Sequence, residues 1–160
     1  MTIRKCRDDE RPAIFRIINA AAERYRGAIP AEHWHEPYMS MDQLEREIGL
    51  GIVFSGYEED GELVGVMGIQ PMGEVDLIRH AYVLPRRQGA GVGGALLRHL
   101  TEASERPILI GTWAAAEWAI AFYLRNGFRL VEREEAQALL RRYWAVPPEQ
   151  MEVSVVLADR

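Results

Sequence analysis

The sequence predicts an α+β domain built on a mixed, mostly antiparallel sheet flanked by helices. Residues 52–57 and 62–70 are rich in strand-forming residues and are joined across Asp60-Gly61, a pair typical of two-residue hairpin turns. Residues 75–104 give a strand, a glycine-rich turn and a helix, because an apolar run is followed by apolar residues at helical spacing. The 160 residues contain no repeat, low-complexity stretch or linker, which favours one domain spanning residues 1–160.

Breaker residues and periodicity predict the remaining elements. Residues 2–7 favour a short strand, and Pro12 marks the start of an amphipathic helix that ends near residue 26. A loop with two prolines follows. A second helix is expected at 40–48, capped by Ser40 or Asp42 and ended by Gly49 or Gly51. The later elements are a strand at 107–113, a helix ending at Asn126-Gly127, a strand at 128–132, a helix at 134–144 broken by Pro147-Pro148, and a last strand at 151–157.

Composition narrows the classes of partner and the compartment. The net charge is −5 and no basic block occurs, which disfavours nucleic acid as a partner. No apolar run approaches the roughly 18 residues of a membrane span, and the N-terminus lacks the apolar core of a signal peptide. Cys6 is the only cysteine, so no internal disulfide can form. We therefore expect a cytoplasmic protein without a membrane partner.

The most informative stretch is the glycine-rich turn at residues 88–94. Four glycines in six residues would cost a helix interior roughly 1 kcal/mol each. Glycines are kept where the backbone takes a positive φ or comes close to a ligand. The N–H groups at the start of the following helix are free, and the helix dipole favours an anion there. The turn is therefore predicted to hold a phosphate-bearing ligand.

Two phosphate-binding motifs fit this turn poorly. A Walker loop ends in Gly-Lys-Ser/Thr, whereas this turn ends in Gly93-Gly94-Ala95. The dinucleotide pattern G-x-G-x-x-G is present, but it also needs an acidic residue at the end of the next strand to hold the ribose. The strand at 107–113 ends without Asp or Glu. A nicotinamide-dependent oxidoreductase is therefore disfavoured.

A third pattern matches more of the chain. Residues 88–93, Gln-Gly-Ala-Gly-Val-Gly, match the Q/R-x-x-G-x-G/A signature of the GCN5-related N-acetyltransferase (GNAT) superfamily. Residues 119–128 resemble the second block of that superfamily, A-x-x-F-Y-x-x-x-G-F. The order of the predicted strands and helices also resembles the fold of this superfamily over essentially the whole chain. The resemblance implies the GNAT (acyl-CoA N-acyltransferase) fold, with a helical insertion at about 134–148 before the last strand as a departure from it.

The resemblance implies an acetyl-CoA-dependent N-acetyltransferase, with acetyl-CoA as the acyl donor and no metal. The pantetheine arm would lie along Ala81, Tyr82 and Val83, and the N–H of Val83 would polarise the thioester carbonyl. The backbone of the turn would bind the pyrophosphate. The residues implied for that contact are Gln88, Gly89, Ala90, Gly91, Val92, Gly93 and Gly94.

Two side chains are candidates for proton transfer. Tyr123 aligns with the superfamily tyrosine that protonates the departing CoA thiolate, a suitable role for a phenol with a pKa near 10. His80 is a candidate general base, and period-two counting places Asp76 on the same face of the strand. A buried histidine is more often a hydrogen-bonded core residue, and many members of the superfamily have no identifiable base. Ala116 stands where the superfamily often has a CoA-contacting Asn, so we expect that contact to be absent, or to be supplied by Thr112 or a water.

The resemblance also indicates where the amine acceptor binds. Tyr25 and the loop at 33–38 would line the acceptor pocket, and Trp113 and Trp144 could contribute. The acceptor would be a small-molecule or peptide amine, and a homodimer would not be unusual. The insertion could cover this pocket, form a dimer contact or be surface elaboration. A catalytically silent acyl-CoA sensor or partner-binding domain stays open as an alternative to an enzyme.

Overall fold

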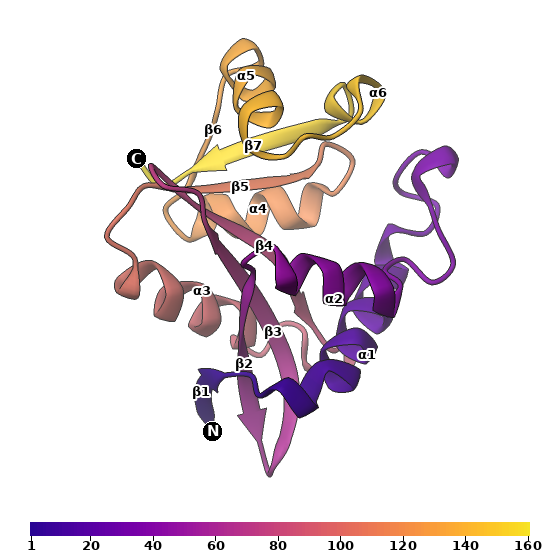
Figure 1. Cartoon of the computed structure of the whole chain (residues 1–160), viewed down its shortest axis with the longest axis vertical. Helices are drawn as coiled ribbons and strands as arrows, with labels where there is room; N and C mark the ends of the chain where they lie inside the picture. The colour runs from indigo at the N-terminus through magenta and orange to yellow at the C-terminus, as the bar shows by residue number, and fades with distance from the viewer.

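The computed structural model describes residues 1–160 and contains one seven-stranded sheet, in the order β1-β2-β3-β4-β5-β7-β6 (Figure 1). Only the pair β4–β5 is parallel, and the other neighbouring strands run antiparallel. The mixed, mostly antiparallel sheet predicted from the sequence is therefore correct. The strands are β1 (Thr2–Lys5), β2 (Val53–Glu59), β3 (Glu62–Pro71), β4 (Asp76–Val83), β5 (Ile108–Trp113), β6 (Arg129–Leu130) and β7 (Ser154–Ala158).

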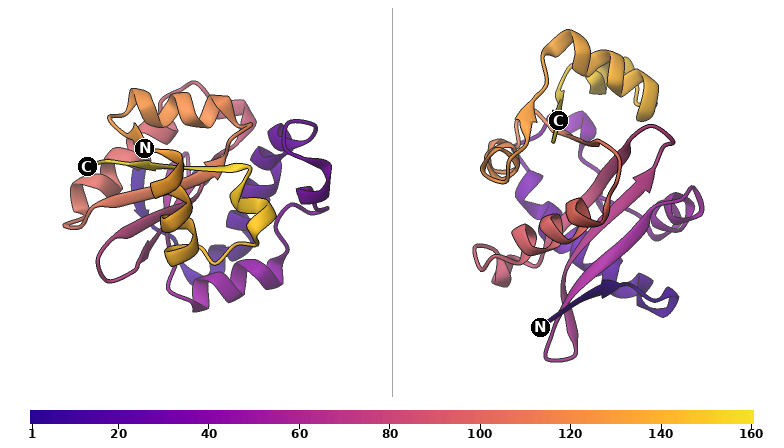
Figure 2. Two further views of the ribbon diagram at one scale, coloured as in Figure 1. Left: turned by 90° about the horizontal axis from the view of Figure 1, so that it is seen from above. Right: turned by 90° about the vertical axis from the view of Figure 1, so that its left-hand side faces the viewer.

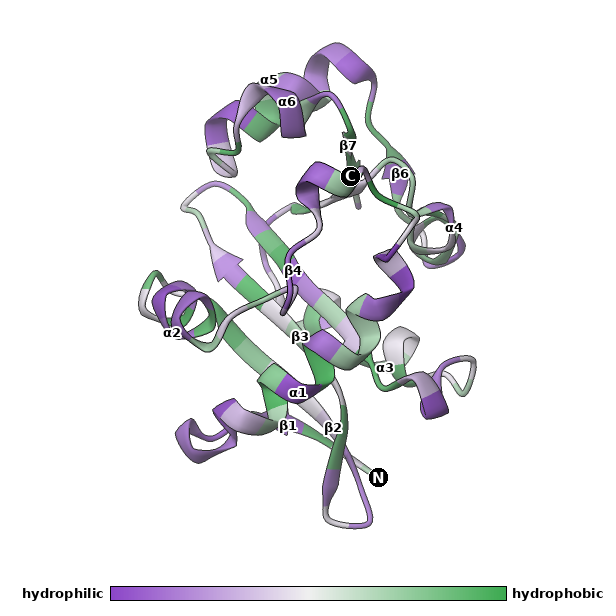
Figure 3. Ribbon diagram, turned by 90° about the vertical axis from the view of Figure 1, so that its right-hand side faces the viewer, coloured by the Kyte–Doolittle hydropathy of each residue, from purple (hydrophilic) through white to green (hydrophobic).

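Helices cover both faces of this sheet. The core on one face joins α3 and α4 to inward side chains such as Met67, Ile78 and Ile110. Alternate strand residues point to the opposite face, where α1 and α2 pack against Phe54 and Val66 and where α5 covers the region of β5 and β7. Figure 3 shows hydrophobic residues along the middle of the strands. The helices are α1 (Arg11–Ala22), α2 (Met41–Gly49), α3 (Val92–Ala103), α4 (Glu117–Arg125), α5 (Arg133–Tyr143) and α6 (Pro148–Met151).

Local sequence signals explain several element ends. Asp60 and Gly61 both have positive φ, as a tight hairpin turn between β2 and β3 requires. The hydroxyl of Ser40 accepts a hydrogen bond from the N–H of Gln43 (3.1 Å), so Ser40 caps α2. The left-handed Gly127 ends α4, and the N–H of the next residue, Phe128, bonds back to the carbonyl of Tyr123 (3.1 Å).

The C-terminal part differs from the expected boundaries. The strand expected at 128–132 is reduced to the two-residue β6, because the chain leaves the sheet edge and starts α5 at Arg133. Pro147-Pro148 does end the preceding helix, but Pro148 also begins the short α6, since proline is favoured in a first helical turn. Met151 therefore lies in α6, and the last strand begins only at Ser154.

A β-bulge in β4 and the early end of its pairing with β5 shape the region of the functional site. Val66 pairs with Tyr82 and Gly68 with Arg79, so Met67 faces two residues of β4 and a β-bulge results. His80 lies in this bulge with a φ of 58°, an uncommon conformation for a residue other than glycine. The parallel pairing of β4 with β5 extends only through Ile78 and Ile110. Beyond these residues the two strands are no longer paired, and the space between them opens.

The segment containing α5 and α6 stands at the end of the molecule remote from the β2–β3 turn (Figures 1 and 2). Its Trp144 packs against β5, where a Cβ added to Gly111 would come within 3.0 Å of the indole. Arg142 forms an exposed ion pair with Glu74, in the turn that precedes β4 (2.7 Å). The insertion is therefore held against the sheet beside the opening between β4 and β5.

Candidate active site

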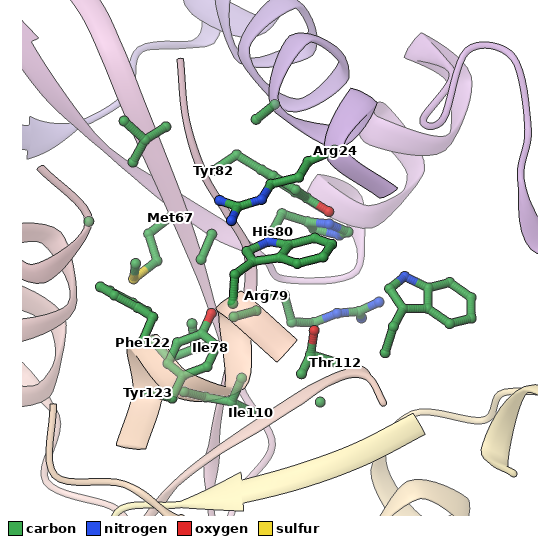
Figure 4. A pocket seen from close by; sticks show the side chains of 18 of the residues that line it. Arg24, Met67, Ile78, Arg79, His80, Tyr82, Ile110, Thr112, Phe122 and Tyr123 are labelled. Atoms are coloured by element: carbon green, nitrogen blue, oxygen red, sulfur yellow. The ribbon is translucent and has the colours of Figure 1, made fainter. Parts of the chain in front are cut away.

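A cavity of about 840 Å³ occupies the opening between β4 and β5. Its walls come from the ends of β4 and β5, the glycine turn before α3, the helix α4, the end of α1 and the insertion. Figure 4 shows Phe122 and Tyr123 from α4, Thr112 from β5, and His80 and Tyr82 from β4 around one space. The cavity thus joins the glycine turn to the loop regions predicted to bind the acceptor.

The glycine turn presents unpaired backbone donors to this cavity. Gly89 and Gly91 have φ values of 82° and 86°, and Gly91 is the N-cap of α3. Within residues 88–94, only Gln88 and Ala90 donate their N–H groups to backbone carbonyls. The free N–H groups and the N-terminal dipole of α3 form a site suited to a phosphate. Of the seven residues predicted for this contact, Ala90 alone does not line the cavity.

Packing and side chains around the turn support the same interpretation. A Cβ on Gly93 would lie 3.3 Å from the ring of Phe122, so glycine lets α3 and α4 come close. The amide of Gln88 donates to the carbonyl of Val83 (3.2 Å) and ties the turn to the end of β4. Arg87 lines the cavity, and its buried Nε lacks a hydrogen-bond partner. This part of the cavity is therefore rich in donors that can take an anion.

Tyr123 lies in the wall of the cavity on α4, with 6% of its surface exposed. Its ring packs edge-on against Phe122 and Phe128, at centroid distances of 5.1 and 6.1 Å. Burial raises the pKa of Tyr123 above its usual value, and the nearby Tyr25 raises it further. The phenol therefore stays protonated at neutral pH. Figure 4 shows its hydroxyl directed into the space between the labelled side chains.

His80 also lines the cavity, and it is held by a carboxylate that the sequence did not reveal. Its Nε2 lies 2.6 Å from Oε1 of Glu47, a buried residue of α2. Gln43 donates to the other oxygen of Glu47 (2.8 Å), and Arg79 lies 3.3 Å from Oε1. Burial raises the pKa of Glu47, but the hydrogen bond and charge of His80, with Gln43 and Arg79, outweigh it and lower the pKa to about 2.

The state of Glu47 fixes the tautomer of His80. An ionised carboxylate can only accept hydrogen bonds, so Nε2 of His80 must carry a proton and donate it to Glu47. In the neutral imidazole, Nδ1 is then the unprotonated nitrogen. His80 and Glu47 together form a histidine–carboxylate pair at the wall of the cavity. The amphipathic pattern of α2 was the only sequence signal for Glu47, since that position falls beside the buried Leu44.

The expectation that Asp76 and His80 share a face of β4 is wrong. Asp76 accepts hydrogen bonds from Ser104 (2.6 Å) and Arg106 (2.8 Å), which follow α3 on one side of the sheet. His80 instead reaches Glu47 on α2, on the opposite side. The bulge inserts one extra residue between the two positions, and period-two counting fails across it.

The remaining wall of the cavity is aromatic. Tyr25 lies at its centre, with ring centroids 5.3 Å from Tyr38, 6.3 Å from Tyr82 and 5.9 Å from Trp118. Trp113 donates its indole N–H to the hydroxyl of Tyr38 (2.9 Å). These five residues are called the aromatic wall below. Burial raises the pKa values of Tyr25, Tyr38 and Tyr82, so the aromatic wall is uncharged at neutral pH.

The predicted acceptor residues are brought together only in part. Tyr25, Tyr38, Trp113 and Trp144 line the cavity as expected. His33 and Trp34 instead pack behind it, against Trp113 and Tyr38 respectively. No group of three or more His, Cys, Asp or Glu side chains is arranged to hold a metal ion.

Ala116 and Thr112 were considered for contacts with CoA, and the insertion for a cover over the acceptor pocket. Ala116 is buried at the start of α4, while Thr112 and Asn126 line the cavity. The insertion contributes four lining residues, so it forms part of the wall: Leu140, Trp144, Val146 and Gln150. No helix of the chain has the length and apolar character needed to cross a membrane.

Comparison with solved structures identifies the fold. A PaiA N-acetyltransferase from Thermoplasma acidophilum, in complex with coenzyme A, superposes with a TM-score of 0.75 at 17% identity, covering 99% of this chain and 98% of the other. A ribosomal-protein-alanine N-acetyltransferase from Brucella melitensis gives a TM-score of 0.67 at 19% identity, with the same coverages of 99% and 98%.

A third structure, N-acetylglutamate synthase from Neisseria gonorrhoeae complexed with coenzyme A and N-acetyl-glutamate, gives a TM-score of 0.71 at 22% identity. The match covers 99% of this chain but only 34% of the synthase. No curated protein sequence matches this chain. The acetyltransferase (GNAT) domain family matches residues 51–130, which contain β2 to β6 and the glycine turn. The chain therefore belongs to the GNAT acetyltransferase family and has its acyl-CoA N-acyltransferase fold.

Proposed function

We propose that this protein is an acetyl-CoA-dependent N-acetyltransferase that moves the acetyl group to an amine by direct attack. The observation that carries the proposal is the shared cavity, which joins the unpaired donors of the glycine turn to Tyr123 and His80. The turn binds the pyrophosphate of CoA, and the pantetheine arm lies along Ala81, Tyr82 and Val83. The N–H of Val83 polarises the thioester carbonyl in this proposal.

His80 prepares the acceptor for attack. An amine is protonated in neutral water and must lose a proton before it can form the new C–N bond. Nδ1 of His80 takes that proton, while Glu47 accepts a hydrogen bond from Nε2 and stabilises the imidazolium that results. The left-handed backbone of His80 supports this role, because strained conformations are found preferentially at functional sites.

Tyr123 completes the transfer. When the tetrahedral intermediate collapses, the C–S bond breaks, the sulfur of CoA leaves as a thiolate, and the nitrogen releases its second proton to solvent to give the neutral amide. Tyr123 donates its phenolic proton to that sulfur, and solvent then restores the proton on the phenol. Burial raises the pKa of Tyr123, so the phenol begins each cycle protonated and enters this step as a proton donor.

The experiment compares the wild-type protein with Tyr123→Phe. Calorimetric titration measures acetyl-CoA binding, and a thiol reagent measures CoA release with a panel of amines. We expect unchanged acetyl-CoA affinity and a fall in kcat of about 10²- to 10⁴-fold, the usual contribution of a general acid. Tyr143→Phe is the matched control, because Tyr143 lies outside the cavity on α5.

Two outcomes would contradict the proposal. Turnover unchanged in Tyr123→Phe would remove Tyr123 from the mechanism. Saturable acetyl-CoA binding by the wild-type protein without thiol release for any amine would favour a silent acyl-CoA sensor.

A further inference from the structure

The cavity is lined by positive charge alone. Its charged side chains are Arg24, Arg79, Arg87 and Arg125, together with the titratable His80. None of the 24 aspartates and glutamates of the chain lines it, although the protein carries a net charge of −5. Two of these arginines are paired with carboxylates behind the wall, Arg79 with Glu47 (3.3 Å) and Arg87 with Glu59, whereas Arg24 and Arg125 have no carboxylate partner. The unpaired arginines therefore favour ligands with negative groups.

The four arginines lie in two pairs at opposite ends of the cavity. Arg87 precedes the glycine turn and Arg125 ends α4, so both stand near the site expected for the phosphates of CoA. Arg24 follows α1 beside the aromatic wall, and Arg79 belongs to the bulged part of β4 (Figure 4). The phosphates of CoA at the glycine turn do not account for this second pair.

Arg24 has no carboxylate partner in the chain. Its guanidinium carbon instead lies 4.4 Å from the ring centroid of Trp118, and the side chain is exposed. This cation–π contact holds the guanidinium at the edge of the aromatic wall while its N–H donors stay available. Arg79 is anchored by Gln70 (3.1 Å) and by Glu47 (3.3 Å). One free and one anchored guanidinium therefore stand at the acceptor end.

The aromatic wall supplies the second half of the argument. Its rings are close enough to form a continuous uncharged surface, which is typical of a pocket for a flat or apolar group. A polycationic amine would meet two arginines and no carboxylate there. An amine that also carries a carboxylate and an apolar group would complement both the arginines and the aromatic wall.

We propose that the acceptor is a free α-amino acid with an aromatic or large apolar side chain. Its carboxylate pairs with Arg24, its side chain lies against the aromatic wall, and its amine faces His80. This inference rests on the proposed N-acetyltransferase function and deepens it by naming the substrate class. It disfavours polyamines and lysine-rich peptides as acceptors.

The test uses pairs of probes in which a carboxylate is replaced by a neutral carboxamide. L-phenylalanine and L-tryptophan are compared with their carboxamides, and spermidine serves as a cationic probe. Each is titrated calorimetrically into protein saturated with CoA, and each is assayed for thiol release with acetyl-CoA. We expect the free acids to bind about 10- to 100-fold more tightly than the carboxamides, because charge-assisted pairs with Arg are strong.

Variants connect this preference to Arg24. Arg24→Gln should abolish the preference for acid over carboxamide and leave CoA affinity unchanged. Arg98→Gln, at an exposed position of α3 outside the cavity, should keep the preference. Equal or stronger binding of the carboxamides or of spermidine, or no binding of either free acid, would overturn the inference.

The two proposals fail in different ways. Thiol release with carboxamides or spermidine, but not with the free acids, would leave an N-acetyltransferase with another acceptor class. Binding of the free acids without thiol release for any probe would instead contradict the transferase function and retain the ligand class.

Discussion

The carboxylate of Glu47 should stabilise both the fold and the reactive form of His80. Replacing it by glutamine removes the negative charge and keeps nearly the same shape. The side chain is 10% exposed and interacts with His80, Gln43 and Arg79. Because the buried partners are arranged around a charge, the neutral amide should satisfy them poorly.

The magnitude follows from the pKa of Glu47. Folding lowers it from an ordinary value of 4.5 to about 2. At about 1.4 kcal/mol for each pKa unit, the carboxylate contributes about 3 kcal/mol to the free energy of unfolding at pH 7. For a domain of this size, Glu47→Gln should lower Tm by about 6–12 °C.

The dependence on pH has a definite direction. A carboxylate whose pKa is lowered by folding stabilises the protein above its unfolded pKa, and the effect disappears as pH falls toward the folded pKa. The gap between the wild-type protein and Glu47→Gln should therefore be full at neutral pH, narrow below pH 4.5 and vanish near pH 2. Urea denaturation at several pH values measures this gap. Glu45→Gln, at an exposed position of the same helix, is the control.

Activity gives an independent readout of the same variant. Glutamine can present either an oxygen or an N–H to the imidazole, so the tautomer of His80 is no longer fixed. We expect kcat to fall at least about 10-fold, which is less than the about 10²- to 10⁴-fold contribution of a complete general base. The KM for acetyl-CoA should stay constant. A Glu47→Gln protein as stable as the wild type at pH 7, with unchanged kcat, would refute the reasoning.

Three further predictions follow from other contacts. Gly91→Ala should weaken acetyl-CoA binding and lower the free energy of unfolding by about 1–3 kcal/mol, because φ is 86° at the N-cap of α3. Calorimetry measures the affinity and urea denaturation the stability, and wild-type values in both would contradict the prediction. Trp144→Ala should raise the KM for the amine without changing acetyl-CoA affinity, since Trp144 lines the cavity from the insertion. Steady-state kinetics measure this KM, and an unchanged value would mean that the indole serves only to pack against Gly111. Glu10→Gln should cost about 1 kcal/mol at pH 7 and little near pH 2, because the hydrogen bond from Arg4 lowers the pKa of Glu10 to about 2 while nearby solvent screens the pair. A stability gap independent of pH in denaturation experiments would count against this pair.

Much of the fold could be predicted because its signals are local. The Asp60-Gly61 turn, the Ser40 cap and the Gly127 end of α4 each depend on a few neighbouring residues. The short β6 and the helix α6 were missed for the opposite reason. Their extents depend on where β7 pairs at the sheet edge, which no local pattern encodes.

In the candidate site, too, the residues marked by local sequence signals were predicted and those defined by distant contacts were not. Helix-terminus physics and a glycine pattern pointed to the turn at 88–94, and all but one of its residues line the cavity. Tyr25, Tyr38, Trp113 and Trp144 also line it as expected. Glu47 and Arg24 could not be selected among the many charged residues, because their roles depend on neighbours remote in sequence.

The sequence by itself determined the order of strands and helices, the phosphate-binding turn and the position of Tyr123. These features depend on spacings of a few residues, over which backbone geometry is fixed. Only the tertiary structure decided that His80 faces Glu47 instead of Asp76, and that no Asp or Glu is among the residues lining the cavity. The physical reason is the β-bulge: one extra residue reverses the alternation of side chains, and the resulting partners come from a helix more than thirty residues away in the sequence.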